Sequence, residues 1–205
     1  MTDAADISAN SHKTRAVFLD RDGVLIEDVH LLVCAEQVRL AQGAAAAVSA
    51  LKRAGYEVIV VTNQAVVARG LAKESDVDRV HERVQELLVQ AGGVPVDAFY
   101  YCPHHPNATL PQYRVACECR KPRPGLLLRA ARERHVDLRR SYVVGDRMTD
   151  IAAGCRAGCS TILILSGRHS AAPIETPDPV EPTCRPGDVC TSLAEAAELI
   201  LWRGR

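Results

Sequence analysis

The sequence has no excess charge of either sign, because its 205 residues include 25 Lys and Arg and 25 Asp and Glu. Without a net positive field, the chain offers no general attraction for nucleic acid or for an anionic membrane surface. It also lacks an apolar run long enough to span a bilayer, and its N-terminus lacks the charged-then-apolar pattern of a secretory signal. We therefore expect neither a nucleic-acid partner nor a membrane partner. The sequence also shows no internal repeat.

What the sequence does contain is enough apolar material for one substantial core. Hydrophobic residues make up 47% of the chain, and its length fits one domain. We expect a short polar tail over residues 1–13 and a single domain over residues 14–205. Eight cysteines without a signal indicate a reducing compartment, the cytoplasm, where thiols bind metal or occupy the core.

Short apolar runs alternate with helical stretches along the chain. Strands are expected at 16–20, 57–62, 97–101, 141–145 and 161–165, and helices at 43–54, 74–91, 125–135 and 148–157. Loops are expected at 102–124 and 166–190, and Ser192 with Glu195 predicts a capping box for a final helix. This alternation predicts an α/β fold: a doubly wound parallel sheet with helices on both faces.

The segment 16–24 carries the strongest functional signal. Four apolar residues lead into Asp20, Arg21, Asp22 and Gly23. Because strand side chains alternate with period two, Asp20 and Asp22 can point the same way, and two such acids repel unless a cation or a proton lies between them. The segment predicts a divalent-metal site. A strand that ends in a solvated acidic turn is the alternative that it leaves open.

Polar residues also follow the other predicted strands. Thr62, Asn63 and Gln64 end one strand, Asp146 and Arg147 end another, and Arg120 and Lys121 precede a helix. Ligands of parallel sheets lie beyond the carboxyl ends of the strands, so these groups should meet at one edge. There, a carboxylate beside Mg²⁺ can attack phosphorus, and Asp146 can complete the oxygen shell of the ion. Thr62 and Asn63 can hydrogen-bond the transferring group, and Lys121 can offset its charge. The set predicts phosphoryl transfer through an aspartyl phosphate.

The motifs DRDGV, VTNQ, RKP and GDRMTD occur in an order that resembles the haloacid dehalogenase superfamily of phosphohydrolases, over residues 16 to about 165. The resemblance implies that Asp20 is the nucleophile, and that Asp22 protonates the leaving oxygen and then deprotonates the attacking water. It implies that Thr62 and Lys121 steady the phosphoryl group. The implied Mg²⁺ ligands are Asp20, Asp146 and the backbone carbonyl of Asp22, with Asp150 orienting that shell.

A segment rich in Pro, Cys and His, residues 102–120, is a second candidate metal site. Cys102, His104, Cys117 and Cys119 offer three thiols and one imidazole, which suits a closed, tetrahedral and therefore structural Zn²⁺ site. His105 is the alternative imidazole ligand, and a set of free cytosolic thiols is the alternative to a metal. The other cysteines are expected to be small core residues: Cys34, Cys155, Cys159, Cys184 and Cys190.

The same segment resembles a narrower family. Cys-Pro-His-His-Pro, followed by Cys-x-Cys-Arg-Lys-Pro, is similar to the D-glycero-D-manno-heptose 1,7-bisphosphate 7-phosphatases and to the related histidinol-phosphate phosphatases. The resemblance implies an enzyme without a large cap that uses Mg²⁺ and Zn²⁺ and removes the 7-phosphate from a small phosphorylated sugar. Several guanidinium groups suit a doubly phosphorylated ligand. The expected substrate contacts are Arg21, Asp28, Asn63, Gln64, Arg69, Arg120 and Arg147. We expect a monomer.

Three positions depart from the pattern of this family. Ile26 replaces an Asn, Leu31 lies where a Gly-Tyr pair is usual, and Val66 replaces a Gly. The first two bear on substrate identity, and Val66 is expected to distort the loop near the phosphate. Two alternatives therefore stay open. One is hydrolysis of histidinol phosphate or another small phosphomonoester, and the other is a non-catalytic, zinc-stabilised binding module.

Overall fold

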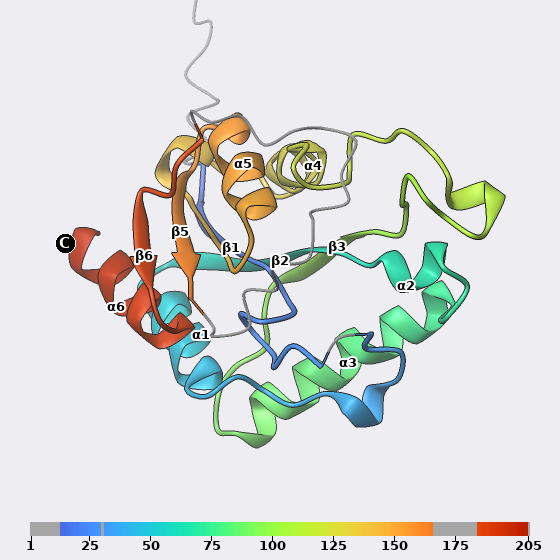
Figure 1. Ribbon diagram of the computed structural model, residues 1–205. Coiled ribbons are helices and arrows are strands. Elements are labelled where there is room, and N and C mark those ends of the chain that lie inside the picture. The colour runs from blue at the N-terminus through green and yellow to red at the C-terminus, as the bar shows by residue number, and fades with distance from the viewer. Residues whose placement is uncertain (1–12, 30, 166–183, 205) are drawn as a thin grey trace, which may run out of the picture.

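The computed structural model describes residues 13–29, 31–165 and 184–204. Its centre is one six-stranded parallel sheet (Figure 1). The strands are β1 (Arg15–Leu19), β2 (Tyr56–Asn63), β3 (Ala98–Cys102), β4 (Tyr142–Gly145), β5 (Ser160–Ile164) and β6 (Asp188–Cys190). The α-helices are α1 (Ala44–Arg53), α2 (Ala65–Ala68), α3 (Glu74–Gln90), α4 (Gly125–Glu133), α5 (Met148–Ala157) and α6 (Leu193–Arg203). The predicted doubly wound α/β fold is confirmed.

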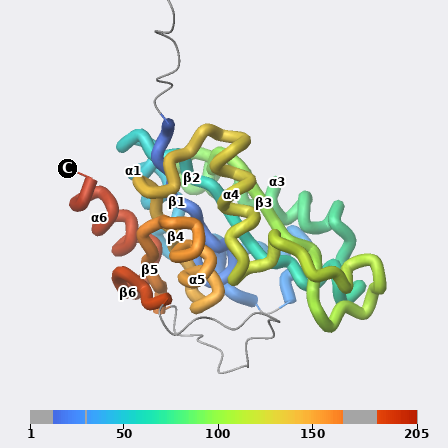
Figure 2. Tube along the Cα trace, turned by 90° about the horizontal axis from the view of Figure 1, so that it is seen from above, coloured from blue at the N-terminus to red at the C-terminus, as the bar shows by residue number. Residues whose placement is uncertain are grey.

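Alternation along β1 explains why helices cover both faces of the sheet. Ala16 and Phe18 belong to a buried cluster with residues of α4 and α5, whereas Val17 and Leu19 belong to another with residues of α1, α3 and α6. Successive strand side chains point to opposite faces, so a strand that is apolar throughout needs a layer of helices on each side. Figure 2 shows α1 beside α6, and Figure 1 shows α4 beside α5 across the sheet from them.

The strand order creates the place where a ligand can bind. From one edge to the other the strands lie in the order β3-β2-β1-β4-β5-β6, so the chain runs outward from β1 in one direction and later outward from β4 in the other. Such a reversal opens a crevice beyond the carboxyl ends of the two central strands. Asp20 directly follows β1 and Asp146 directly follows β4, which brings both acids to this crevice.

Among the α-helices and strands of the described residues, α2 and β6 lie outside the predicted set. Helix α2 follows β2 after one residue, and β6 lies inside the loop expected at 166–190, where it pairs with β5. Elements of three or four residues are too short for hydrophobic periodicity to reveal, and β6 exists because β5 offers it a partner. Residues 1–12 of the expected tail and 166–183 of the expected loop lie outside the described residues.

Of the two hydrogen bonds in the capping box predicted for α6, one is confirmed. The Ser192 hydroxyl accepts a hydrogen bond from the Glu195 N–H at 3.2 Å, but the Glu195 carboxylate accepts from the Thr191 N–H at 2.7 Å instead of from that of Ser192.

Within the described ranges, no helix is both long and apolar enough to pass through a bilayer. All eight cysteines lie in these ranges as free thiols, and of the five expected in the core, Cys184 and Cys190 are buried and the others half-buried.

Candidate active site

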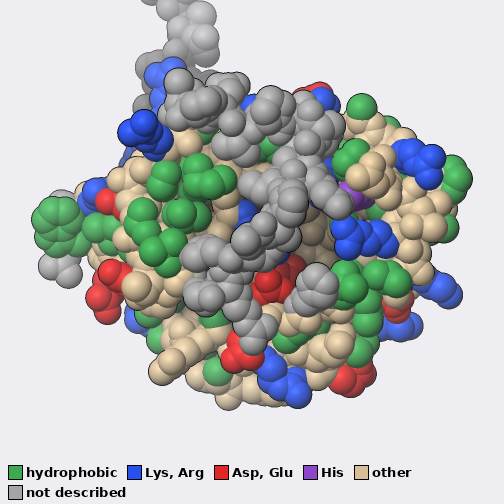
Figure 3. Space-filling model, in the orientation of Figure 1, with side chains coloured by type: hydrophobic (Ala, Val, Ile, Leu, Met, Phe, Trp, Pro, Cys, Tyr) green, Lys and Arg blue, Asp and Glu red, His purple; other side chains and the backbone are tan. Residues whose placement is uncertain are grey.

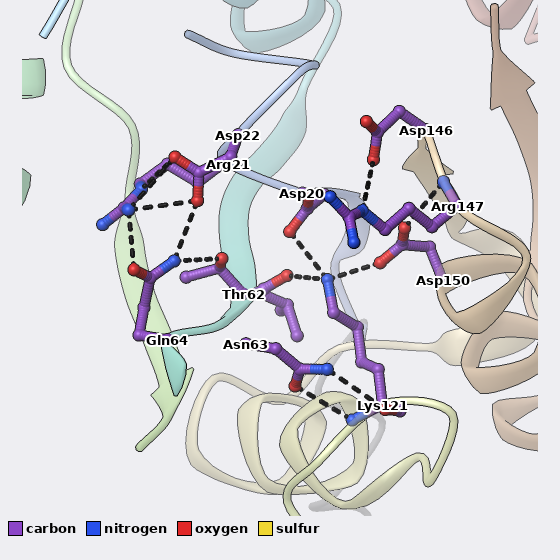
Figure 4. Close-up of polar contacts among 11 residues, drawn as sticks. Asp20, Arg21, Asp22, Thr62, Asn63, Gln64, Lys121, Asp146, Arg147 and Asp150 are labelled. Atoms are coloured by element: carbon purple, nitrogen blue, oxygen red, sulfur yellow. Dashed lines mark hydrogen bonds and ion pairs between the residues drawn. The ribbon is translucent and has the colours of Figure 1, made fainter. Parts of the chain in front are cut away.

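A buried lysine organises the carboxyl end of β1. Lys121 Nζ donates to Asp20 Oδ1 and to the Val61 carbonyl, each at 2.7 Å, and it forms an ion pair with Asp150 (Figure 4). Burial by itself would lower the pKa of Lys121, but Asp150 and Asp20 outweigh burial and raise it. The ammonium group is therefore charged, and its three partners match its three donors. Two residues that lie 101 positions apart in the sequence, Asp20 and Lys121, are in direct contact.

Three carboxylates crowd together beside this lysine. Asp20, Asp146 and Asp150 are buried, and each offers an oxygen within 4.8 Å of the others. Burial, reinforced by the charges of Asp20 and Asp150, raises the pKa of Asp146 from 3.8 to about 8. Burial also raises the pKa of Asp150, to about 6, against the opposing effect of Lys121. The raised pKa values mean that burial and mutual repulsion disfavour the charged forms of these acids. A bound cation would stabilise those charged forms.

One carboxylate oxygen of this cluster indicates that a hard cation would fit the site. Asp146 Oδ1 is buried and accepts no hydrogen bond from the described part of the chain, and Arg147 Nε lies 3.9 Å away from it. A buried carboxylate oxygen without a hydrogen-bond donor is costly, and an oxygen-seeking ion such as Mg²⁺ would satisfy it. The side chains of Asp20 and Asp146 fit this ion.

Gly23 makes room for Asp146. Its φ is +82°, and a Cβ added there would lie 2.4 Å from Asp146 Oδ2. Glycine is therefore required at this turn for two reasons: the left-handed backbone disfavours other residues, and the carboxylate occupies the space of a side chain. The sequence predicted a turn where a side chain would obstruct, and the obstructed neighbour is Asp146.

The Asp22 carboxylate points away from the three clustered acids, as Figure 4 shows. It accepts a hydrogen bond from Arg21 Nη2 at 3.0 Å and another from Gln64 Nε2 at 2.9 Å, both on Oδ2. Gln64 Nε2 also donates to Thr62 Oγ1 at 2.8 Å. The predicted acid–base group and the predicted phosphoryl-binding hydroxyl are therefore linked through one amide.

Two of the expected substrate contacts, Arg21 and Gln64, are buried beside Asp22. Arg21 is 1% exposed and Gln64 is 4% exposed, and they bond each other as well as Asp22. Thr62 and Lys121 are just as buried, so a contact of Arg21 or Gln64 with a substrate stays a prediction. Asn63 also holds another residue in place, because its side-chain amide donates to the Lys121 carbonyl at 3.1 Å and accepts from the Lys121 N–H at 3.0 Å.

The remaining expected substrate contacts lie nearer the surface. Arg147 is exposed, and its Nη2 lies 3.8 Å from Asp28 Oδ2. Arg120 is half-buried, and its Nη1 donates to the His104 carbonyl at 3.0 Å. Arg69 is half-buried at the end of α2. Figure 3 shows acidic side chains near the centre of one face, with basic side chains beside them, and a role of these four residues in substrate binding stays a prediction.

The cysteine and histidine cluster has the dimensions of a tetrahedral site. Side-chain atoms of Cys102, His104, Cys117 and Cys119 all lie within 4.8 Å of one another. The Cys102 sulfur lies 3.6 Å from that of Cys117 and 3.1 Å from that of Cys119, and His104 Nδ1 lies 3.4 Å from the Cys119 sulfur. Four ligands about 2.3 Å from a central zinc would stand roughly 3.8 Å apart, so small shifts would admit the ion.

The electrostatics of this cluster also favour a cation. The hydrogen-bonding contact with the Cys102 sulfur outweighs burial and lowers the pKa of Cys119 to about 5. The lowered pKa of Cys119 favours the thiolate, which is the form that binds metal. The alternative imidazole, His105, is buried outside the cluster, and its Nδ1 accepts a hydrogen bond from the Asn107 N–H at 3.1 Å.

The three positions that depart from the family pattern lie in different parts of the structure. Ile26 is fully buried in the core cluster of β1, and Leu31 is exposed. Val66 lies in α2 and packs with Val67 and Val77. The expected distortion at Val66 is absent, because this position is helical, a backbone conformation that any residue adopts and that glycine does not favour.

Sequence reasoning missed His81, which it left without a role. His81 lies on α3, is 7% exposed, and places Nε2 at 3.4 Å from Arg21 Nη1. Sixty positions separate the two residues, and a single histidine on an amphipathic helix carries no local signal of such a contact.

The sequence of this chain is similar to those of several named proteins. Residues 118–196 match the HAD-hydrolase-like family. A protein from Rhodopseudomonas palustris named D-glycero-beta-D-manno-heptose-1,7-bisphosphate 7-phosphatase is 44% identical over 153 residues, which cover 74% of this chain and 84% of that protein. A protein of the same name from Escherichia coli (strain K12) is 37% identical, over 75% of this chain and 80% of that protein.

Solved structures agree with these relatives. The D,D-heptose 1,7-bisphosphate phosphatase from B. bronchiseptica, complexed with magnesium and phosphate, matches with a TM-score of 0.75 and 34% identity, over 92% of this chain and 99% of that chain. The enzyme of the same name from Burkholderia thailandensis matches with a TM-score of 0.60 and 25% identity, over 91% and 98%. Because named relatives align over most of their length and share the fold, this chain belongs to the heptose bisphosphate phosphatase family of haloacid dehalogenase-like hydrolases.

Proposed function

We infer that this protein is a Mg²⁺-dependent phosphatase that removes the 7-phosphate from D-glycero-D-manno-heptose 1,7-bisphosphate through an aspartyl phosphate on Asp20. The observation that carries the proposal is the buried group of Asp20, Asp146, Asp150 and Lys121 at the point where the strand order reverses. Named relatives with this activity support the choice of substrate.

Asp20, Asp146 and the backbone carbonyl of Asp22 would hold the magnesium ion. When bound, Mg²⁺ neutralises negative charge between the Asp20 carboxylate and the phosphoryl oxygens. Asp150 holds the surroundings of this site, because it pairs with Lys121 and its Oδ2 accepts the Arg147 N–H at 3.1 Å.

The first chemical step forms a bond between an Asp20 carboxylate oxygen and phosphorus, and it breaks the bond between phosphorus and the sugar oxygen. Lys121 orients Asp20 through its hydrogen bond to Oδ1 and offsets the charge of the phosphoryl group. Asp22 gives a proton to the leaving sugar oxygen. The Thr62 hydroxyl donates a hydrogen bond to a phosphoryl oxygen.

The second step returns the enzyme to its starting state. A water oxygen bonds to phosphorus, Asp22 takes up a proton of that water, and the bond between phosphorus and Asp20 breaks. Inorganic phosphate leaves, and Asp22 again carries the proton that the next turnover needs. The partly exposed Asp22 side chain is accessible to both the leaving group and the water.

A structural Zn²⁺ ion bound by Cys102, His104, Cys117 and Cys119 completes the proposal. It would hold the segment 102–120 in shape, and that segment leads directly into Lys121. Four protein ligands fill a tetrahedral shell, so this ion takes no part in the chemistry.

The surface arginines and the cellular setting belong to the same proposal. Arg69, Arg120 and Arg147, with Asp28, contact the sugar and its second phosphate. The protein is a monomer in the cytoplasm, with no membrane or nucleic-acid partner, and the eight free thiols support a reducing compartment.

The experiment is phosphate release in the presence of Mg²⁺ from both anomers of heptose 1,7-bisphosphate, histidinol phosphate and fructose 1,6-bisphosphate. We expect a strong preference for a heptose bisphosphate, and none of this activity in Asp20→Asn. Release from another ester alone would keep the chemistry and overturn the substrate. A folded, zinc-containing protein that releases phosphate from none of them would favour the binding module.

A further inference from the structure

A chain of buried side chains lies behind Asp22, on the side away from the three clustered acids (Figure 4). His81 Nε2 lies 3.4 Å from Arg21 Nη1, and Arg21 Nη2 donates to Gln64 Oε1 at 2.7 Å. Gln64 Nε2 then donates to both Asp22 Oδ2 and Thr62 Oγ1. The chain therefore begins in the core and ends on the two groups that are expected to touch the substrate.

The charge of Arg21 fixes which way round the Gln64 amide lies. A guanidinium group only donates hydrogen bonds, so it must face the amide oxygen. The Asp22 carboxylate accepts, so it must face the amide nitrogen. A flipped amide would oppose donor to donor at Arg21 and acceptor to acceptor at Asp22, which leaves buried groups unsatisfied. Gln64 has one favourable orientation.

This orientation also sets the direction of the Thr62 hydroxyl. Thr62 Oγ1 accepts the Gln64 N–H, so its own proton is available for another acceptor. A phosphoryl oxygen is such an acceptor, and a donor oriented before the substrate arrives costs no reorganisation during the reaction. One amide therefore prepares both Asp22 and Thr62.

His81 closes the inner end of the chain. Burial, and then the charge of Arg21, lowers the pKa of His81 to about 3, so the ring is neutral and can accept from Arg21. The ring stacks on Phe99 with centroids 4.3 Å apart and meets Tyr101 edge-on at 5.6 Å. These aromatic neighbours fix the ring and with it the guanidinium group.

We propose that His81, Arg21 and Gln64 are positioning residues that hold the Asp22 carboxylate and the Thr62 hydroxyl in their orientations for phosphoryl transfer. This inference rests on the proposed phosphatase function. It gives Arg21 and Gln64 a role other than substrate contact, and it predicts that their loss is felt most where the reaction depends on proton donation by Asp22.

The test compares two esters that differ in this dependence. A sugar phosphate has a poor leaving group and needs the proton of Asp22, whereas p-nitrophenyl phosphate has a good one and does not. Release of each alcohol is measured in a single turnover with excess enzyme, so that the bond-breaking step is observed. General acid catalysis contributes about 10²- to 10⁴-fold, which sets the range of the expected differences.

The first variant is Gln64→Glu, which keeps the size of the side chain and the acceptor for Arg21 but removes the donor. We expect the single-turnover rate on heptose bisphosphate to fall about 100-fold and that on p-nitrophenyl phosphate about tenfold, because only the first depends on both Asp22 and Thr62. The matched control is Gln85→Glu, since Gln85 donates to the Val96 carbonyl at 3.0 Å away from the site. The control should leave both rates unchanged.

The second variants test the inner end of the chain and serve if Gln64→Glu does not fold. His81→Phe keeps the aromatic packing but removes the acceptor, and the rate on the sugar phosphate should fall about fivefold with little change on p-nitrophenyl phosphate. His81→Gln restores an acceptor near the Nε2 position and should recover most of that rate.

Equal losses on the two esters, or no loss, in folded variants would overturn the proposal, and so would failure of His81→Gln to recover activity lost in His81→Phe. A different outcome bears on the substrate alone. If the wild-type protein hydrolyses another sugar phosphate and not heptose bisphosphate, the proposed substrate is wrong, and the same comparison with that ester tests the positioning role.

Discussion

Gly23→Ala is the substitution whose effect the structure specifies most closely. The added Cβ would lie 2.4 Å from Asp146 Oδ2, about 1 Å inside an ordinary contact, so either the turn or the carboxylate must move. The left-handed φ of +82° adds a backbone cost of about 1–2 kcal/mol. Because Asp146 is the acid with the strongest need for a cation, the movement should act on magnesium binding.

The expected result separates folding from function. Misplacement of a reacting or metal-binding group by about 1 Å can cost on the order of 100-fold, so kcat/KM should fall by about that factor. The Mg²⁺ concentration for half-maximal activity should rise about tenfold. The backbone cost alone should lower Tm by only about 2–8 °C for a chain of this length.

The control is Gly55→Ala, because Gly55 has the same φ of +82° but nothing within 4 Å of the added Cβ. This variant should show the Tm loss with unchanged kcat/KM and unchanged magnesium dependence. The assay is a magnesium titration of phosphate release for both variants, together with thermal unfolding. If Gly23→Ala loses no more activity than Gly55→Ala, the contact with Asp146 does not control the metal site, and our reasoning is wrong.

Three further predictions concern the metals and the buried charges. In metal-free protein, the folded state keeps a proton on Asp146 that the unfolded chain gives up, so the free energy of unfolding should fall as pH rises from about 4 to 8, and Asp146→Asn should remove most of this slope in urea titrations. Added Mg²⁺ should stabilise the protein more at pH 8 than at pH 6; a reversed order would contradict the raised pKa. Purified protein should contain one zinc per chain, and Cys119→Ser or chelation should lower both zinc content and Tm; a metal analysis without zinc would contradict the site. Lys121→Met leaves two buried acids without their cation and should cost about 3–5 kcal/mol of unfolding free energy, besides abolishing turnover; unchanged urea stability would contradict the buried pairing.

The order of the elements was predictable because the signals that define them are local. The apolar run before Asp20 and the helical spacing in α3 each involve residues that lie within a few positions of one another in the sequence. The same holds for the ligand spacing of Cys117 and Cys119. Elements without such a signal, α2 and β6, were missed, since three or four residues show no period and β6 depends on its pairing with β5.

The outcome for the polar residues near the site was mixed. Placing Asp20, Lys121 and Asp146 at one edge followed from the rule that parallel strands present their carboxyl ends together, and the structure brings them together. Arg21 follows Asp20 in the same motif but lies beyond the end of β1, and its side chain is buried against Gln64 and His81, which no local pattern predicted.

The fold class and the groups that can do chemistry were predictable from the linear chain, because they depend on residue type and short-range spacing, and the order of the motifs was recognisable from a family resemblance. Which groups are in contact depends on the packed tertiary structure. It turned Asp22 toward Arg21 and Gln64, joined His81 to them across 60 positions, and set Asp146 against Gly23. Burial and contacts between distant segments arise only when the sheet and its helices pack, and they carry no period or spacing that the linear chain could reveal.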